Sequence, residues 1–98
     1  MLKIQYRMHE EISDWSSEAM YDGKLESGES VRYRRLCDLE HVEENDDTES
    51  PMIIIDTAGC DMGEEKDEVG STRNEGEALV VKEHLERLIQ AGLRAEEI

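Results

Sequence analysis

Arg7 is the residue whose type and position point most directly to chemistry. It lies in the run Gln5-Tyr6-Arg7, after a weakly alternating segment that is typical of a short strand. In α/β folds, ligand-binding residues lie at the ends of strands. A guanidinium is an always-charged planar fork that fits phosphate oxygens. The alternative is a surface ion pair with one of the many nearby acidic residues, and the residues taken alone favour that alternative.

The next segment must position this run, and its pattern predicts a helix. Between His9 and Tyr21, the apolar residues Ile12, Trp15 and Ala19 fall three and four positions apart. We expect this stripe to belong to the core. The following Tyr21-Asp22-Gly23-Lys24 is typical of a helix stop and turn.

A second strand and a second helix are predicted further along the chain. Residues 51–57 (Pro-Met-Ile-Ile-Ile-Asp-Thr) form a continuous apolar run of the kind found in strands covered on both faces. Asn74 is placed to cap a helix that ends near Gly92, with Glu77 reaching back in a capping box. The acidic segment 40–50 has no apolar spacing and is interpreted as a solvated loop or a locally disordered insert.

These elements alternate as strand, helix, loop, strand and helix, which predicts an α/β fold with a parallel sheet and flanking helices. Two parallel strands cannot cover themselves, so we expect the fold to be incomplete.

Composition narrows the classes of function. The 98 residues carry a formal net charge of −15, which repels nucleic acid over most of the surface. No apolar stretch approaches the roughly 20 residues of a membrane helix. Cys37 and Cys60 lie far apart, so we expect no metal site. The sequence also lacks a signal peptide pattern, which favours an intracellular protein, cytoplasmic or nuclear, that is not secreted.

Three segments together resemble a known family of helicases. Gln5-Tyr6-Arg7-Met8-His9, followed by Tyr21-Asp22-Gly23-Lys24-Leu25, resembles motif IV of the superfamily 1 helicases of the nonsense-mediated-decay and immunoglobulin-mu-binding-protein type. The run 51–59 is similar to their next strand, and residues 71–78 are similar to the start of their next helix. The resemblance implies that residues 1–98 are the N-terminal half of the second RecA-like (P-loop NTPase-type) domain.

The resemblance also implies roles for individual residues. Arg7 would be the catalytic arginine finger, and Gln5, Tyr6 and Arg7 would bind the nucleotide, with Tyr6 packing on the base. For Tyr6 a core position is the alternative, and for Gln5 it is hydrogen bonding at the strand end. Thr57, Ser71 and Asn74 are candidates for contacting nucleic-acid phosphates. Turn formation and helix capping are the alternatives, and both are favoured.

The implied function is that of part of an ATP-dependent 5′-to-3′ helicase acting on single-stranded RNA or DNA. ATP and Mg²⁺ would be held mainly by the first RecA-like domain in cis. No G-x-x-x-x-G-K-[ST] phosphate loop or Asp-Glu box is present, so the 98-residue chain alone is predicted to be inactive. A non-catalytic acidic interaction module and a truncated helicase remnant are the alternatives.

Overall fold

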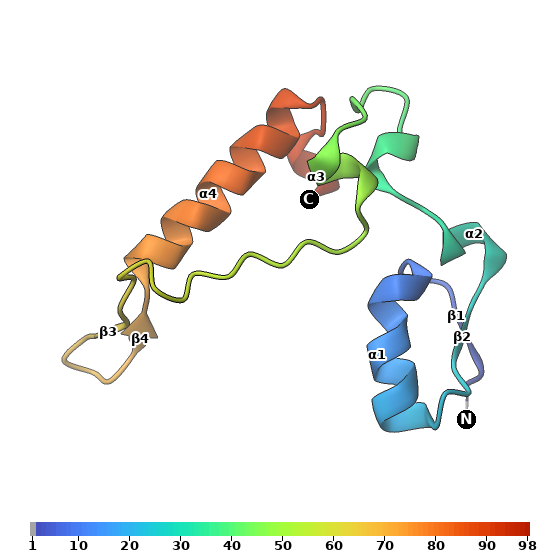
Figure 1. Ribbon diagram of the computed structural model, residues 1–98, viewed down its shortest axis with the longest axis horizontal. Coiled ribbons are helices and arrows are strands. Elements are labelled where there is room, and N and C mark those ends of the chain that lie inside the picture. The colour runs from blue at the N-terminus through green and yellow to red at the C-terminus, as the bar shows by residue number, and fades with distance from the viewer. Residues whose placement is uncertain (1) are drawn as a thin grey trace.

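The computed structural model describes residues 2–98, so the first residue of the predicted 1–98 unit lies outside the described residues. Figure 1 shows two groups of elements on opposite sides of the molecule, with the long extended run of residues 51–57 inside the second group. The Cα radius of gyration is 17.1 Å, whereas a compact domain of about 100 residues has a radius near 13 Å. The elements are therefore spread apart and do not surround one shared core.

The first group is a small β-α-β unit. Strand β1 (Ile4–Gln5) leads into helix α1 (Glu10–Tyr21), and strand β2 (Glu26–Ser27) returns parallel to β1 with Gln5 opposite Ser27. A parallel pair joined by a helix confirms the predicted α/β class. The partner of the first strand, however, comes from residues 26–27 and not from the predicted strand at 51–57.

The ends of α1 follow the local signals in the sequence. The His9 Nδ1 accepts a hydrogen bond of 3.1 Å from the Glu11 amide and caps the helix start. At the other end, Asp22 and Gly23 adopt left-handed backbone conformations with φ of 52° and 71°. The predicted stop and turn are therefore confirmed.

The buried face of α1 is not the predicted one. Trp15 is 68% exposed and Ile12 is 39% exposed, and Ala19 is exposed as well. The two buried residues of the helix are Ser13 and Ser17. Their short hydroxyl side chains let the helix backbone approach residues 25–27 and satisfy polar groups there, which an indole ring could not do. The predicted core role of Ile12, Trp15 and Ala19 is wrong.

The predicted strand at 51–57 is also wrong. The segment is extended, but residues 52–57 belong to no sheet, and Ile54 is 84% exposed. A parallel-sheet strand is stabilised by ladder hydrogen bonds to its neighbours. Among residues 2–98 no strand lies beside this segment, which runs in Figure 1 from the short helix of residues 46–49 to the loop before the helix of residues 75–90.

Most residues of the acidic segment 40–50 are exposed, as in a solvated loop, but part of the segment is helical. Helix α2 (Glu29–Arg32) and the short 3₁₀ helix η1 (Leu36–Asp38) precede it, and helix α3 (Asp46–Glu49) forms within it. Thr48 is fully buried and Val42 is 7% exposed. The run of acidic residues dominates the composition, but these two side chains point inward and anchor the segment.

Helix α4 (Glu75–Gln90) begins and ends as predicted. The Asn74 Oδ1 accepts a 3.0 Å hydrogen bond from the Glu77 amide, which confirms the cap. The reciprocal half of the capping box is wrong, because the Glu77 carboxylate accepts from the Thr57 hydroxyl at 2.8 Å instead. Gly92 has φ of 110°, and a Cβ there would overlap the His41 carbonyl, so the predicted left-handed glycine is confirmed.

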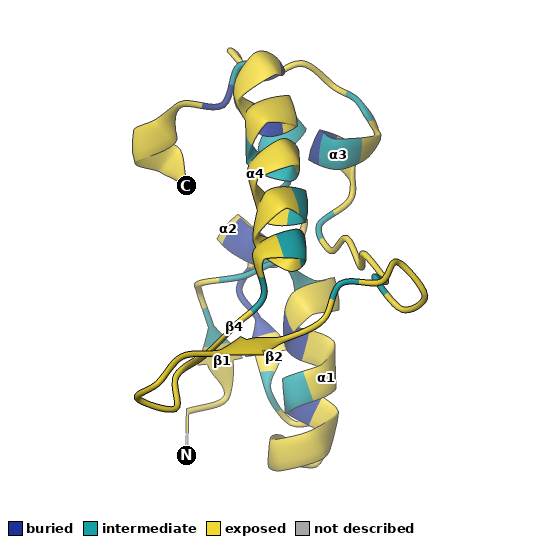
Figure 2. Ribbon diagram, turned by 90° about the vertical axis from the view of Figure 1, so that its left-hand side faces the viewer, coloured by how far each residue is buried: buried dark blue, intermediate teal, exposed yellow. Residues whose placement is uncertain are grey.

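Only the C-terminal end of α4 packs into a core. Leu88 joins Val42 and Leu93 in a buried cluster, with Leu36 partly buried against it. Most of the helix surface is exposed, as Figure 2 shows. The 3₁₀ helix η2 (Ala95–Glu97) follows α4, and a two-stranded antiparallel hairpin of β3 (Glu65–Lys66) and β4 (Thr72–Arg73) precedes it. In the part of the chain that the structure describes, no helix is long and apolar enough to span a membrane.

Candidate functional site

The loop after β1 presents Arg7 to solvent. The Arg7 amide donates a 2.8 Å hydrogen bond to the Gln5 Oε1, which fixes the backbone at this point. Arg7 itself is exposed, and its guanidinium forms no ion pair or hydrogen bond with any residue of the range 2–98. The surface ion pair considered for this residue is therefore absent from the described part of the chain, and the charge is available to a ligand.

Arg7 borders two hollows. A groove of about 670 Å³ extends from Arg7 and His9 toward Arg34 and Leu39. A second hollow of about 590 Å³ extends from Arg7 along β1, past Tyr6 to Leu25. A phosphate-bearing ligand in either hollow would meet the same guanidinium.

Tyr6 is not a core residue. It is 64% exposed, and its ring lies so close to the backbone of Gly28 that a Cβ there would overlap it. The Gly28 amide also donates to the Gln5 carbonyl at 2.8 Å, which brings the two backbones together. Gly28 therefore makes room for the ring, a role that sequence reasoning missed because one glycine gives no signal of what approaches it.

Gln5 uses its amide group entirely inside the protein. The Oε1 accepts from the amides of Arg7 and Met8, at 2.8 Å and 3.0 Å. The Nε2 donates to the Met8 carbonyl at 2.8 Å and to the Ser27 hydroxyl at 2.6 Å. The structure thus shows the strand-end hydrogen bonding that was the alternative for this residue.

The predicted nucleic-acid residues lie at the other end of the molecule, near the start of α4. Asn74 caps that helix and its Nδ2 donates to the Met62 carbonyl at 3.0 Å. Thr57 is joined to the helix through Glu77, and the Ser71 amide donates to Asp67 at 2.8 Å. Asn74 therefore caps the helix and the backbone of Ser71 takes part in a turn, while the Thr57 hydroxyl is bonded to Glu77.

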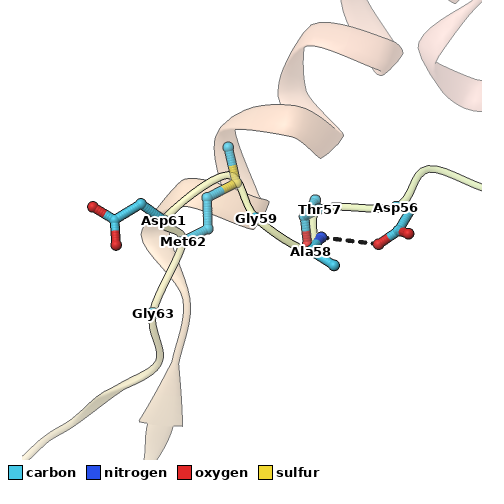
Figure 3. Close-up of a pocket in the computed structure, with 7 residues that line it drawn as sticks. All are labelled: Asp56, Thr57, Ala58, Gly59, Asp61, Met62 and Gly63. Carbon is cyan, nitrogen blue, oxygen red and sulfur yellow. Dashed lines mark hydrogen bonds between the residues drawn. The ribbon is translucent and has the colours of Figure 1, made fainter.

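A hollow of about 690 Å³ lies beside these residues. It is lined by residues 56–59 and 61–63, which Figure 3 shows as a loop around the start of α4. The Asp56 carboxylate accepts from the Ala58 amide at 2.8 Å, and the Asp61 side chain points away from the loop. Two carboxylates and no basic side chain line this hollow, so its local field opposes a phosphate.

The structure does not bring the two predicted sets of residues together. In Figure 1, β1 and the β3–β4 hairpin lie on opposite sides of the molecule. Within residues 2–98, no three His, Cys, Asp or Glu side chains are grouped to hold a metal ion. Of the predicted site residues, Arg7 and Tyr6 are therefore the candidates for contacting a nucleotide.

One acidic group near the Arg7 groove has a perturbed pKa. The His41 side chain approaches the Glu97 carboxylate at 2.9 Å, and the Arg94 amide donates to the same oxygen at 3.0 Å. The hydrogen bond from His41, followed by that from Arg94, lowers the pKa of Glu97 below its ordinary value of 4.5. Glu97 thus adds a fixed negative charge to a groove that Arg7, Arg34 and Arg35 also line.

A short parallel pair of strands with a helical crossover is consistent with part of a RecA-like α/β domain. Comparison with known proteins gives the family. The family model described as an AAA domain matches residues 1–98, so the chain belongs to this AAA domain family.

Three similar proteins illustrate the relationship. The chain is 43% identical over 99 residues to the DNA-binding protein SMUBP-2 of Rattus norvegicus, covering 100% of this chain and 10% of that protein. It is 43% identical over 103 residues to the DNA polymerase alpha-associated DNA helicase A of Schizosaccharomyces pombe, covering 99% and 16%. It is 36% identical over 96 residues to an uncharacterized ATP-dependent helicase of Methanocaldococcus jannaschii, covering 92% and 14%. The chain therefore spans only a small part of these relatives.

Proposed function

We propose that this chain forms one wall of the ATP site of an ATP-dependent helicase that moves 5′ to 3′ along RNA or DNA. In this proposal, residues 1–98 are the N-terminal half of the second RecA-like domain, and the first RecA-like domain of the complete protein holds the triphosphate and Mg²⁺. The observation that carries the proposal is the unpaired Arg7 guanidinium at the end of β1.

Arg7 would act on the γ-phosphate. During phosphoryl transfer, negative charge is spread over the oxygens of the transferred group, and a fixed positive charge stabilises it. The backbone of Arg7 is held by Gln5, while its side chain is free to reach across a cleft. Tyr6, with 64% of its surface exposed, offers an aromatic face on which a base can stack at about 1–3 kcal/mol.

The names of the relatives support nucleic acid as the partner, since they are described as a DNA-binding protein and as helicases. Thr57, Ser71 and Asn74 remain proposed contacts to phosphate. Replacing all three with alanine in the complete protein should lower the affinity for a single-stranded oligonucleotide, and an unchanged affinity would remove them from the site.

The test of the proposed function is ATP hydrolysis by the complete protein that carries this segment. Arg7→Ala should lower kcat by about a thousand-fold or more. Lys66→Ala is the control, because Lys66 is an exposed cation that lines neither hollow beside Arg7 and forms no ion pair among residues 2–98. We expect the control to keep its kcat. Wild-type hydrolysis by Arg7→Ala would rule out the arginine finger, and hydrolysis by the 98-residue chain alone would contradict the need for the first domain.

A further inference from the structure

The side chain of Gln5 brackets Arg7 with hydrogen bonds on both sides. Its Oε1 holds the amides of Arg7 and Met8, and its Nε2 holds the Met8 carbonyl. The fourth bond, from Nε2 to Ser27, reaches the neighbouring strand at 2.6 Å. A side-chain amide has two donor hydrogens and two acceptor lone pairs, so its whole bonding capacity is used. Only one orientation of the amide satisfies these partners, because the amides of Arg7 and Met8 donate hydrogen bonds and the Met8 carbonyl accepts one.

The bond to Ser27 connects this bracket to the buried part of the β-α-β unit. Ser27 is 5% exposed, and its hydroxyl lies 3.0 Å from that of Ser13, which is 1% exposed. The Ser13 hydroxyl also lies within 3.1 Å of the Glu10 carbonyl in the first turn of α1. Buried hydroxyl groups thus connect the Arg7 loop to both β2 and α1. Such buried networks resist displacement, because breaking one bond leaves a polar group without water or partner.

We propose that Gln5 is a positioning residue for Arg7 and does not itself contact the nucleotide. The inference rests on the proposed function, because it concerns the reaction that Arg7 serves. A nucleotide contact would require Gln5 to give up one of its four internal bonds. Holding the backbone of Arg7 in place matters for the reaction rate, because a displacement of about 1 Å at a reacting centre can cost roughly a hundred-fold in rate. Gln5 therefore affects kcat by fixing the position of Arg7.

The decisive experiment is a double-mutant cycle on ATP hydrolysis by the complete protein. Gln5→Leu keeps a side chain of similar size and removes all four bonds. Alone, it should lower kcat by about a hundred-fold and leave the KM for ATP unchanged. In the Arg7→Ala background, the same change should alter kcat by no more than about two-fold, because the group that Gln5 positions is already gone. Gln90→Leu is the matched control, since Gln90 is exposed at the end of α4 and its side chain forms no hydrogen bond within residues 2–98.

The outcomes separate this inference from the proposed function. If Arg7→Ala hydrolyses ATP like the wild type, the arginine finger fails whatever Gln5 does. If Arg7→Ala is slow but Gln5→Leu is normal, or raises only KM, the positioning role is overturned and the proposed function stands. Multiplicative losses in the double variant would likewise overturn it, because Gln5 would then act independently of Arg7.

A second variant guards against simple unfolding. Gln5→Glu keeps the two acceptors for the amides of Arg7 and Met8 but cannot donate to the Met8 carbonyl. Its kcat should lie between those of the wild type and Gln5→Leu, measured below the melting temperature of both variants. A kcat as low as that of Gln5→Leu, in a protein that circular dichroism shows to be folded at the assay temperature, would overturn the assignment of the two amide contacts.

Discussion

Helices α1 and α4 carry apolar stripes of similar spacing but are held in place by different kinds of contact. α1 is fixed along its length by the buried hydroxyls of Ser13 and Ser17, which face residues 25–27. α4 is fixed at its ends, by the Asn74 cap at its start and by Leu88 near its last turn. Short hydroxyl side chains can therefore dock a helix against a small element. Apolar stripes need a large covering surface, which residues 2–98 provide only beside Leu88.

The largest effect should come from removing the apolar anchor of α4. Leu88 is 8% exposed and packs with Val42 and Leu93. Leu88→Ala should lower the free energy of unfolding by about 2–5 kcal/mol, from lost burial and from the cavity left behind. Urea unfolding followed by circular dichroism measures this change. Leu79→Ala on the same helix is the control, because Leu79 is 61% exposed and should lose far less. Equal losses would mean that the cluster around Leu88 does not anchor the helix.

A smaller effect is expected from removing a hydroxyl anchor of α1. The Ser17 hydroxyl, 4% exposed, donates to the Leu25 carbonyl at 2.9 Å and accepts from the Leu25 amide at 3.1 Å. Ser17→Ala leaves both backbone groups without that partner, which should cost about 1–3 kcal/mol of unfolding free energy. Ser16→Ala is the matched control, since Ser16 is half-buried and forms no side-chain hydrogen bond within residues 2–98. If both serines can be replaced at equal cost, α1 is not held by its hydroxyl face.

The same contrast explains which features the sequence predicts. Helix ends depend on residues within a few positions, so the turn after Tyr21, the Asn74 cap and the left-handed Gly92 are predicted correctly. The strand at 51–57 depends on neighbouring strands, which no local pattern specifies. Burial of Trp15 fails for a related reason, because an apolar stripe shows that a helix has an apolar side without showing what covers it.

The candidate site also combines features that depend on nearby residues with features that depend on distant ones. The position of Arg7 two residues after a strand is a local feature and is predicted from the sequence. The bracket formed by Gln5 is only half local. Its contacts to Arg7 and Met8 span two or three residues, but the contact to Ser27 spans 22 and arises from the parallel pairing of β1 with β2. Sequence reasoning therefore finds the residue with the charge more easily than the residue that places it.

A pH titration tests the contact between His41 and Glu97, which lies beyond the end of α4. The expected change in unfolding free energy is smaller than for Ser17→Ala, because Glu97 lies at the surface. The pKa of Glu97 is lowered in the folded chain, so its contribution to stability is present above the ordinary value of 4.5 and is lost as the pH falls below it. Glu97→Gln should remove this part of the pH dependence, as measured by urea unfolding at a series of pH values. Glu96→Gln alters an exposed neighbour and should leave the dependence unchanged. Identical titrations of the two variants would mean that the contact with His41 does not stabilise the fold.

The smallest effect is expected at the most prominent apolar residue of α1. Trp15 is 68% exposed on the face opposite to the serines, so Trp15→Ala should change the unfolding free energy of this chain by no more than about 0.5 kcal/mol. Trp15 is the only tryptophan, so its fluorescence reports this site alone. We expect emission at the long wavelength of a hydrated indole and strong quenching by iodide. Blue-shifted emission that iodide does not quench would show that the indole is covered, and the contrast between the hydroxyl face and the apolar face of α1 would then fail.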